Sequence, residues 1–157
     1  MEQKHSDQNR KMKRGARIVA KNWLHLRRKQ KVLVVSSEKH VIEAQILKEA
    51  CMEYARQVDL MLVEEKGKKV GIFFDKNEDI FEAYDVIIGA TDYSLVTTKA
   101  VKKARTKGKK YLSFPLSTNN GESMLSYDFL FMDTKKSKMM AGVIKKYIDD
   151  ATYLRIT

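Results

Sequence analysis

The apolar residues of this chain fall into short continuous runs, separated by segments in which apolar positions recur every three or four residues. Lys31 to Ser36 contains four consecutive apolar residues, and Asp59 to Glu64 and Val86 to Ile88 supply two further runs. Short runs that are apolar at every position are typical of strands buried on both faces of a parallel sheet. The pattern therefore predicts strands that alternate with helices.

The clearest such unit lies between Asp85 and Pro115, which reads as a strand, a turn, a helix and a second strand. The first strand ends at Gly89. Ser94 is predicted to cap the helix, because its hydroxyl can accept hydrogen bonds from backbone amides that otherwise lack partners. An apolar stripe on that helix consists of Ala100, Val101 and Ala104.

Gly108 is predicted to end this helix, since glycine readily adopts the left-handed conformation found just after helices. The second strand contains Tyr111, Leu112 and Phe114 and ends at Pro115, which has no amide hydrogen to donate. Two parallel strands joined by a helix form a right-handed βαβ unit.

The N-terminal region predicts a polar, frayed tail over residues 1–8 and a helix over residues 9–28. Its apolar residues have helical spacing, which indicates a face that docks on a core. They are Ala16, Val19, Trp23 and Leu26. A second helix follows the first strand, with Ser36 or Ser37 as its cap. It buries the face that carries Leu47, Ala50, Cys51 and Tyr54.

The remaining segments are less regular. Residues 67–84 predict an irregular connection with a short helix, in which Val70 to Phe74 could instead be an edge strand and Glu78 to Tyr84 looks helical. Lys138 to Asp150 predicts a last helix with Met139, Val143 and Tyr147 inward, and Ile144 left open. Tyr153 to Ile156 predicts a final strand.

Together these elements predict a three-layer α/β/α sandwich around a mostly parallel sheet of about five strands, of the Rossmann-like or flavodoxin-like kind. The 157 residues match the length of one domain, and the only proline is Pro115, so no linker divides the chain. We expect a single domain over residues 1–157.

The net charge of +11 raises the question of a nucleic-acid partner, but most of it is local. Residues 1–31 carry a net +9, while residues 32–157 carry only +2. A helix that docks on the core explains the basic segment better than an arm that binds nucleic acid, because base-stacking aromatic residues are missing. With a single cysteine and no apolar run long enough for a bilayer, the sequence predicts a cytoplasmic protein without a membrane partner.

Residue types that usually carry chemistry are scattered. No glycine follows the first strand and no Walker A sequence occurs, which weakens a nucleotide-binding interpretation. The histidines His5, His25 and His40 are isolated, and a solvated or capping role is favoured for His40. Cys51 lies on a packing face. We therefore predict no catalytic residue, metal site or cofactor site in this chain.

The turn after the third strand is the remaining candidate site. It places Thr91, Asp92, Ser94, Thr97 and Thr98 between the carboxyl end of a strand and the amino end of a helix, where an anion or carboxylate can be attracted. The serine and the three threonines are the candidate ligand contacts. The alternative is that Ser94 caps the helix and the threonines pack.

At these residues the sequence resembles a known family. SLVTTKA, followed by Ala104, Gly108 and a strand ending at Pro115, is similar to the N-terminal domain of leucyl aminopeptidase T-like metallopeptidases. Ala16, Arg17 and Ile18 resemble the family's opening, and the closing ATYLRIT resembles the strand that leads into its second half. Thr97 stands where the family tends to have histidine, and Leu116 follows Pro115 where the family has glycine.

The resemblance implies a non-catalytic N-terminal domain of a two-domain, metal-dependent exopeptidase that removes N-terminal residues from peptides. The divalent metals and their ligands would belong to a C-terminal catalytic domain, which is the partner implied for this chain. A homodimer is a further alternative. A ring-cleaving dioxygenase group shares the architecture, so the family reaction is not unique.

Two other functions remain open from the sequence. One is a free-standing α/β binding module whose basic first helix contacts an acidic partner or nucleic acid. The other is a small-molecule sensor that uses the turn from Thr91 to Thr98 and the loop from Leu116 to Ser123 as its cleft.

Overall fold

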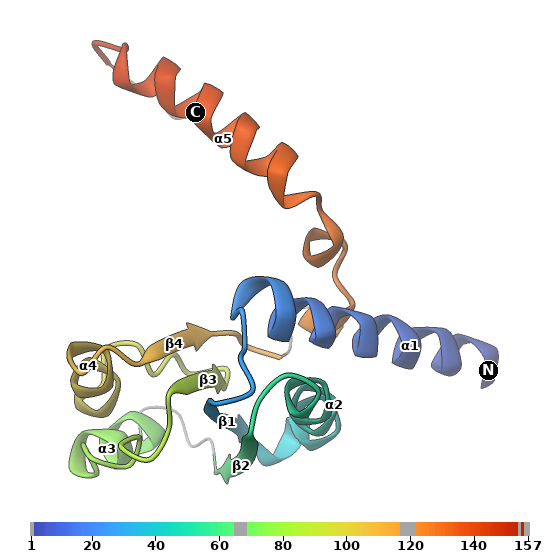
Figure 1. Ribbon diagram of the computed structural model, residues 1–157, viewed down its shortest axis with the longest axis vertical. Coiled ribbons are helices and arrows are strands. Elements are labelled where there is room, and N and C mark those ends of the chain that lie inside the picture. Colours follow the sequence, from blue (N-terminus) through green and yellow to red (C-terminus); the bar gives the residue numbers. More distant parts are fainter. Residues whose placement is uncertain (1, 65–68, 117–121, 154, 156–157) are drawn as a thin grey trace.

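A parallel β-sheet forms the centre of the computed structural model, which describes residues 2–64, 69–116, 122–153 and 155 (Figure 1). Its four strands have the order β2-β1-β3-β4. They are β1 (Lys31–Ser37), β2 (Gln57–Val63), β3 (Val86–Ala90) and β4 (Lys110–Ser113). The predicted α/β fold with a parallel sheet is confirmed, although the described residues form four strands and not five.

The two central strands account for the two most apolar runs. β1 pairs with both β2 and β3, with Val32 opposite Val58 on one side and Val86 on the other. All of β3 is buried, as are six of the seven residues of β1. β2 and β4 contain exposed positions, and among the described residues each of them has a sheet neighbour on one side only.

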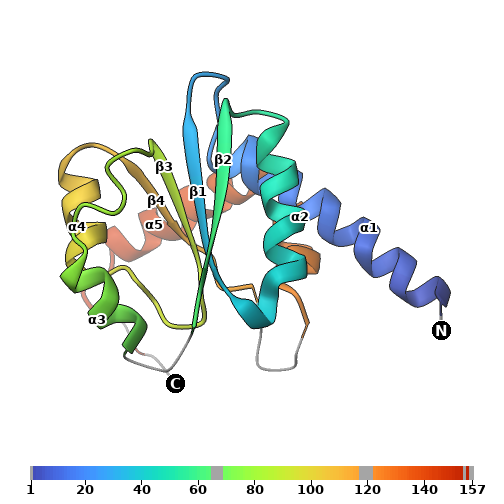
Figure 2. The same ribbon diagram turned by 90° about the horizontal axis from the view of Figure 1, so that it is seen from below.

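Helices cover both faces of the sheet, as the predicted sandwich requires (Figure 2). Alternate residues of β1 point to opposite faces: Val32 and Val34 join one core cluster, while Leu33 and Val35 join the other. The first cluster lies beneath α1 (Glu2–Ile18) and α2 (Val41–Met52). The second lies beneath α3 (Lys69–Lys76) and α4 (Lys99–Thr106).

The N-terminal helix docks on the core, but its bounds differ from the prediction. The helix begins at Glu2, so the backbone of the predicted frayed tail is helical, and a π-helical turn, Val19–Trp23, ends it before residue 28. Beyond that turn His25 has a positive φ of 47°. Ala16 and Val19 are fully buried and Leu26 is nearly so, which confirms that this face docks, whereas Trp23 of the predicted stripe is 36% exposed.

The segment before β3 contains a helix in an unexpected place. Residues 69–76 form α3, where an edge strand was an alternative, whereas residues 78–84 form turns. Val70 and Phe74 are buried and lie four residues apart, a spacing that places both on one face of a helix. Residues 67 and 68 lie outside the described residues.

The helix α4 follows the predicted stripe but not the predicted cap. Thr98 is its N-cap, and its Oγ1 accepts a hydrogen bond from Val101 N at 3.4 Å. Ser94 lies four residues earlier in an exposed turn, so its predicted role as the cap was wrong. Gly108 adopts φ +76° just after the helix, as predicted.

The last helix, α5 (Thr134–Asp149), projects away from the sandwich (Figure 1). None of its residues is buried, so the prediction that Met139, Val143 and Tyr147 point inward was wrong: they are 67%, 54% and 75% exposed. The predicted final strand is absent at Tyr153 and residue 155, and residues 154, 156 and 157 lie outside the described part.

Candidate functional site: a charged cluster at the switch point of the sheet

The carboxyl ends of β1 and β3 lie side by side at the centre of the sheet. The strand order means that the chain leaves β1 toward α2 on one face, whereas it leaves β3 toward α4 on the other. Such a reversal separates the two connections and is where open α/β sheets commonly bind ligands. Ser36 of β1 stands opposite Ala90 of β3 at this point.

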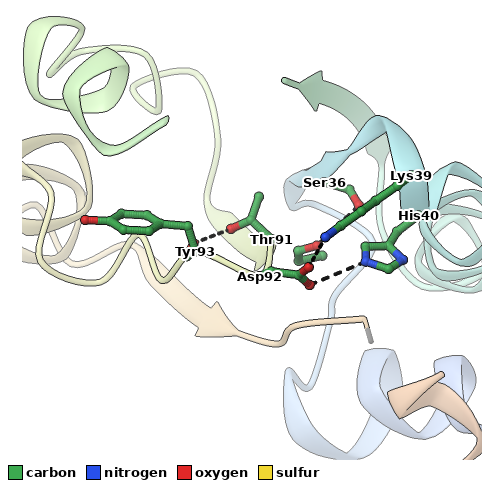
Figure 3. Close-up of polar contacts among 7 residues, drawn as sticks. Ser36, Lys39, His40, Thr91, Asp92 and Tyr93 are labelled. Carbon is green, nitrogen blue, oxygen red and sulfur yellow. Dashed lines mark hydrogen bonds and ion pairs between the residues drawn. The ribbon is translucent and has the colours of Figure 1, made fainter. Parts of the chain in front are cut away.

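Three charged or titratable side chains from the two connections meet here (Figure 3). Lys39 Nζ donates a hydrogen bond to Asp92 Oδ2 and forms an ion pair with it. His40 Nε2 lies 3.4 Å from the other carboxylate oxygen, Oδ1, where a protonated imidazole is attracted to the carboxylate. Asp92 therefore bridges Lys39 and His40.

These three side chains differ in their access to solvent. The side chain of Lys39 is 57% exposed and that of Asp92 35%, whereas that of His40 is only 11% exposed. A ligand that reaches this edge would meet the ammonium and the carboxylate first. His40 would support the cluster from beneath.

Hydroxyl groups surround the charged cluster. Ser36 Oγ donates to the carbonyl of Ala90 at 3.2 Å, and Thr91 Oγ1 donates to the carbonyl of Tyr93 at 2.7 Å. Ser37 Oγ is buried and has no hydrogen-bond partner within the described part of the chain. The hydroxyls of Ser36 and Thr91 are thus used to fix the backbone on each side of Asp92.

The four predicted ligand contacts do not form one cluster. Thr91 is buried beside Asp92, and Thr98 is buried at the start of α4, where its Oγ1 also donates to the carbonyl of Leu95 at 2.7 Å. Ser94 is exposed and accepts a hydrogen bond from Val96 N at 3.5 Å. Thr97 is exposed. Only Thr91 directly adjoins the charged cluster, and ligand contact by the four stays a prediction.

Sequence reasoning missed Lys39, His40 and Asp92 as a group. His40 is buried, and its side chain makes no capping hydrogen bond at the start of α2, so neither predicted role of its side chain is observed. Their positions in the sequence could have indicated the cluster, because Lys39 and His40 closely follow one buried strand and Asp92 closely follows another. Recognising it required the knowledge that β1 and β3 are neighbours.

Outside this cluster, metal ligands and a reactive cysteine are the remaining kinds of chemistry to consider among the described residues. No group of three or more His, Cys, Asp or Glu side chains there could hold a metal ion. Cys51 is fully buried, as predicted, and burial raises the pKa of its thiol to about 12. A thiol with this pKa is a poor nucleophile near neutral pH.

A second charged surface follows the solvent side of α1. Asn9, Arg10, Lys13, Arg14 and Arg17 line a shallow hollow there. Several of these cations already have intramolecular partners. Arg10 pairs with Asp7, Arg14 lies 4.8 Å from the ring centre of Phe131, and Arg17 donates from Nε to both carboxylate oxygens of Glu53.

Comparison of the chain with protein-family models and with curated proteins finds no match. Among the described residues, no helix combines the length and apolar character needed to cross a bilayer.

Proposed function

We propose that this chain is a non-catalytic α/β domain of a metal-dependent, aminopeptidase-like protein. We further propose that the carboxyl edge of its sheet helps to bind the amino-terminal end of a peptide. The observation that carries the second part is the Lys39, Asp92 and His40 cluster at the switch point. The aminopeptidase assignment is supported by the resemblance of Ser94 to Pro115, and by the α/β fold expected for such a domain.

The cluster offers complementary charges to a short peptide. An exopeptidase that acts on N-terminal residues must recognise a free ammonium group, and Asp92 presents a partly exposed carboxylate. The Lys39 ammonium can contact a peptide carbonyl or the terminal carboxylate of a short peptide. Binding would replace the Lys39–Asp92 pair by contacts with the ligand, while His40 stays beside Asp92.

Peptide hydrolysis itself would belong to the catalytic domain. Divalent metals held there would supply polarisation of the scissile carbonyl and activation of a water molecule. The role of the present chain is then to orient the peptide and to support the cleft. Positioning of this kind contributes to the rate because it lowers the entropic cost of reaching a reactive geometry.

A titration followed by nuclear magnetic resonance tests the binding part. Leu-Gly-Gly added to the isotopically labelled chain should shift the amides of Lys39, His40 and Asp92. The N-acetylated peptide should not, because it lacks the ammonium group. Asp92→Asn should weaken binding by about ten-fold, since it removes the carboxylate charge. Asp128→Asn is the matched control. The side chain of Asp128 is 91% exposed, and Asp128 lies far along the sequence from Lys39, His40 and Asp92.

Two outcomes would contradict the proposal. Equal shifts with the free and acetylated peptides would show that no ammonium group is recognised at this edge. Release of nitroaniline from leucine 4-nitroanilide by the purified chain with Zn²⁺, Co²⁺ or Mn²⁺ would contradict the non-catalytic role, provided that the activity disappears in Asp92→Asn.

The row of cations on α1 favours a second candidate function, the binding of an acidic partner or nucleic acid. The engagement of Arg10, Arg14 and Arg17 within the chain weighs against it. Retention of single-stranded RNA by the purified chain at 50 mM salt, lost both at 200 mM salt and in a Lys13→Ala, Arg14→Ala variant, would support it. Absence of retention at 50 mM would exclude it.

A further inference from the structure

The helix α5 presents a broad apolar face to solvent. Its large apolar residues occur as three pairs spaced four residues apart, so all six lie on one side of the helix. They are Met139, Met140, Val143, Ile144, Tyr147 and Ile148, with exposed fractions from 47% to 75%. A contiguous apolar face of this kind on a projecting element indicates a surface that another molecule covers.

Some charges along α5 are not favoured by its own helix dipole, although Asp133 caps its first turn and Lys146 lies in its last turn. Lys135, Lys136 and Lys138 lie in the first turns, where the positive end of the helix dipole disfavours cations. Asp149 and Asp150 lie at the other end, where anions are disfavoured. Asp149 pairs with Lys145 within the helix, whereas no pairing within the helix explains Asp150 or the first lysines. An antiparallel neighbour of the same sequence would compensate both ends.

The sequence of α5 is self-complementary about Val143. Lys136 and Asp150 each lie seven residues from it, which places both within about 20° of its direction around the helix. In an antiparallel pair related by a two-fold axis at Val143, Lys136 of each copy stands opposite Asp150 of the other. Met139 then stands opposite Tyr147, and Val143 meets its own counterpart.

We propose that α5 is a self-association element, and that a second copy of this chain covers the part of its apolar face formed by Met139, Val143 and Tyr147, as an antiparallel helix pair. The interface is isologous, so each charge pair and each apolar contact occurs twice. It uses neither α1 nor the switch-point cluster, and it does not depend on the proposed function. The helix projects from the sandwich, so the pair can form without rearrangement of either core (Figure 1).

Sedimentation of the full chain between 1 and 200 μM tests the proposal. The unaltered chain should shift from monomer to dimer as its concentration rises. Val143→Asp should remain monomeric throughout, because the two-fold axis brings both new carboxylates together. Ile42→Asp is the matched control: Ile42 is 67% exposed on α2, away from the proposed interface, and this variant should dimerise normally.

Charge exchange tests the register. Lys136→Asp and Asp150→Lys should each raise the dimer dissociation constant by about ten-fold, because each replaces two attractive pairs by two repulsive ones. The double variant should restore dimerisation. Failure of the double variant to do so while each single variant dissociates would overturn the proposed pairing.

Two further outcomes would overturn the proposal. The first is a monomer at every concentration. The second is dimerisation that Val143→Asp leaves unchanged. If the monomer instead binds vesicles that contain anionic lipid through α5, the occupant of the apolar face is a lipid surface and not a second copy.

Discussion

At the scale of single residues, Gly15 shows how closely the first helix approaches the rest of the chain. Glycine inside a helix normally lowers its stability. A Cβ atom at position 15, however, would lie 1.9 Å from the carbonyl oxygen of Leu125, which belongs to the short turn Met124–Ser126. No side chain fits there unless the backbone moves, so glycine allows α1 to dock.

We expect Gly15→Ala to lower the free energy of unfolding by about 3 kcal/mol, because overpacking against backbone outweighs the gain in helix propensity. Urea unfolding monitored by circular dichroism measures this. Gly142→Ala is the matched control, since Gly142 is also inside a helix but has open space around it. Equal effects of the two substitutions would contradict the close approach.

Burial of Cys51 predicts a loss of stability at alkaline pH. The pKa of the thiol is raised from 9.0 to about 12 in the folded chain, so between these values the unfolded chain binds fewer protons than the folded chain. The free energy of unfolding therefore decreases as pH rises from 8 to 10, with about 1.4 kcal/mol of the loss due to Cys51.

Urea unfolding at pH 8, 9 and 10 checks this contribution. Cys51→Ala is expected to be less stable at pH 8 because a buried group is truncated, but to lose about 1.4 kcal/mol less between pH 8 and pH 10. If the free energy of unfolding fell equally with pH in the two proteins, the Cys51 thiol would not contribute to the loss of stability.

At the scale of elements, α4 shows which of two hydroxyls the fold uses. Both Ser94 and Thr98 precede the apolar stripe, and either residue type can cap a helix. Leu95, between them, is fully buried in the core cluster beneath α3 and α4. Leu95 therefore anchors the turn formed by residues 91–97, and the helix begins only after it, with Thr98 as its N-cap.

Thr98→Ala should lower the free energy of unfolding by about 1–2 kcal/mol, because it removes the cap of α4 and a buried hydrogen bond to Leu95. Ser94→Ala should change it by less than about 0.5 kcal/mol, since Ser94 is exposed. Chemical denaturation of both variants measures the two losses. A larger loss in Ser94→Ala than in Thr98→Ala would show that Ser94 caps the helix, as the sequence predicts.

For α5 the sequence predicted a helix and its apolar residues, but not their surroundings. The spacing of Met139, Val143 and Tyr147 defines a face whatever lies against it. Whether that face meets the sheet depends on the path of residues 124–133, which carry the chain past α1 and then outward (Figure 1). Local periodicity contains no information about such a path.

At the scale of the whole molecule, stability is distributed unevenly. The central strands β1 and β3 are enclosed by two core clusters, whereas α5 buries no residue. Regions without buried contacts open locally at little cost in free energy, while central strands open only with the whole domain.

Hydrogen exchange should reveal this difference. We expect the amides of Val34 and Ile88 to exchange only through global unfolding, and the amides of α5 to exchange many orders of magnitude faster in dilute solution. Increasing the protein concentration should slow exchange in α5 alone if the helix self-associates. Protection of α5 at low concentration equal to that of β1 would contradict its projection from the domain.

The order of amino acids was enough to predict the parallel strands, the two-sided core, the docking face of α1 and the stripe of α4. These features follow from local periodicity and from residues such as Gly108, whose backbone conformation few other residues adopt readily. Tertiary structure alone decided which strands are neighbours. The order of the sheet brings Lys39 and His40 to Asp92 across more than 50 residues of sequence, and local patterns do not specify pairing at that separation.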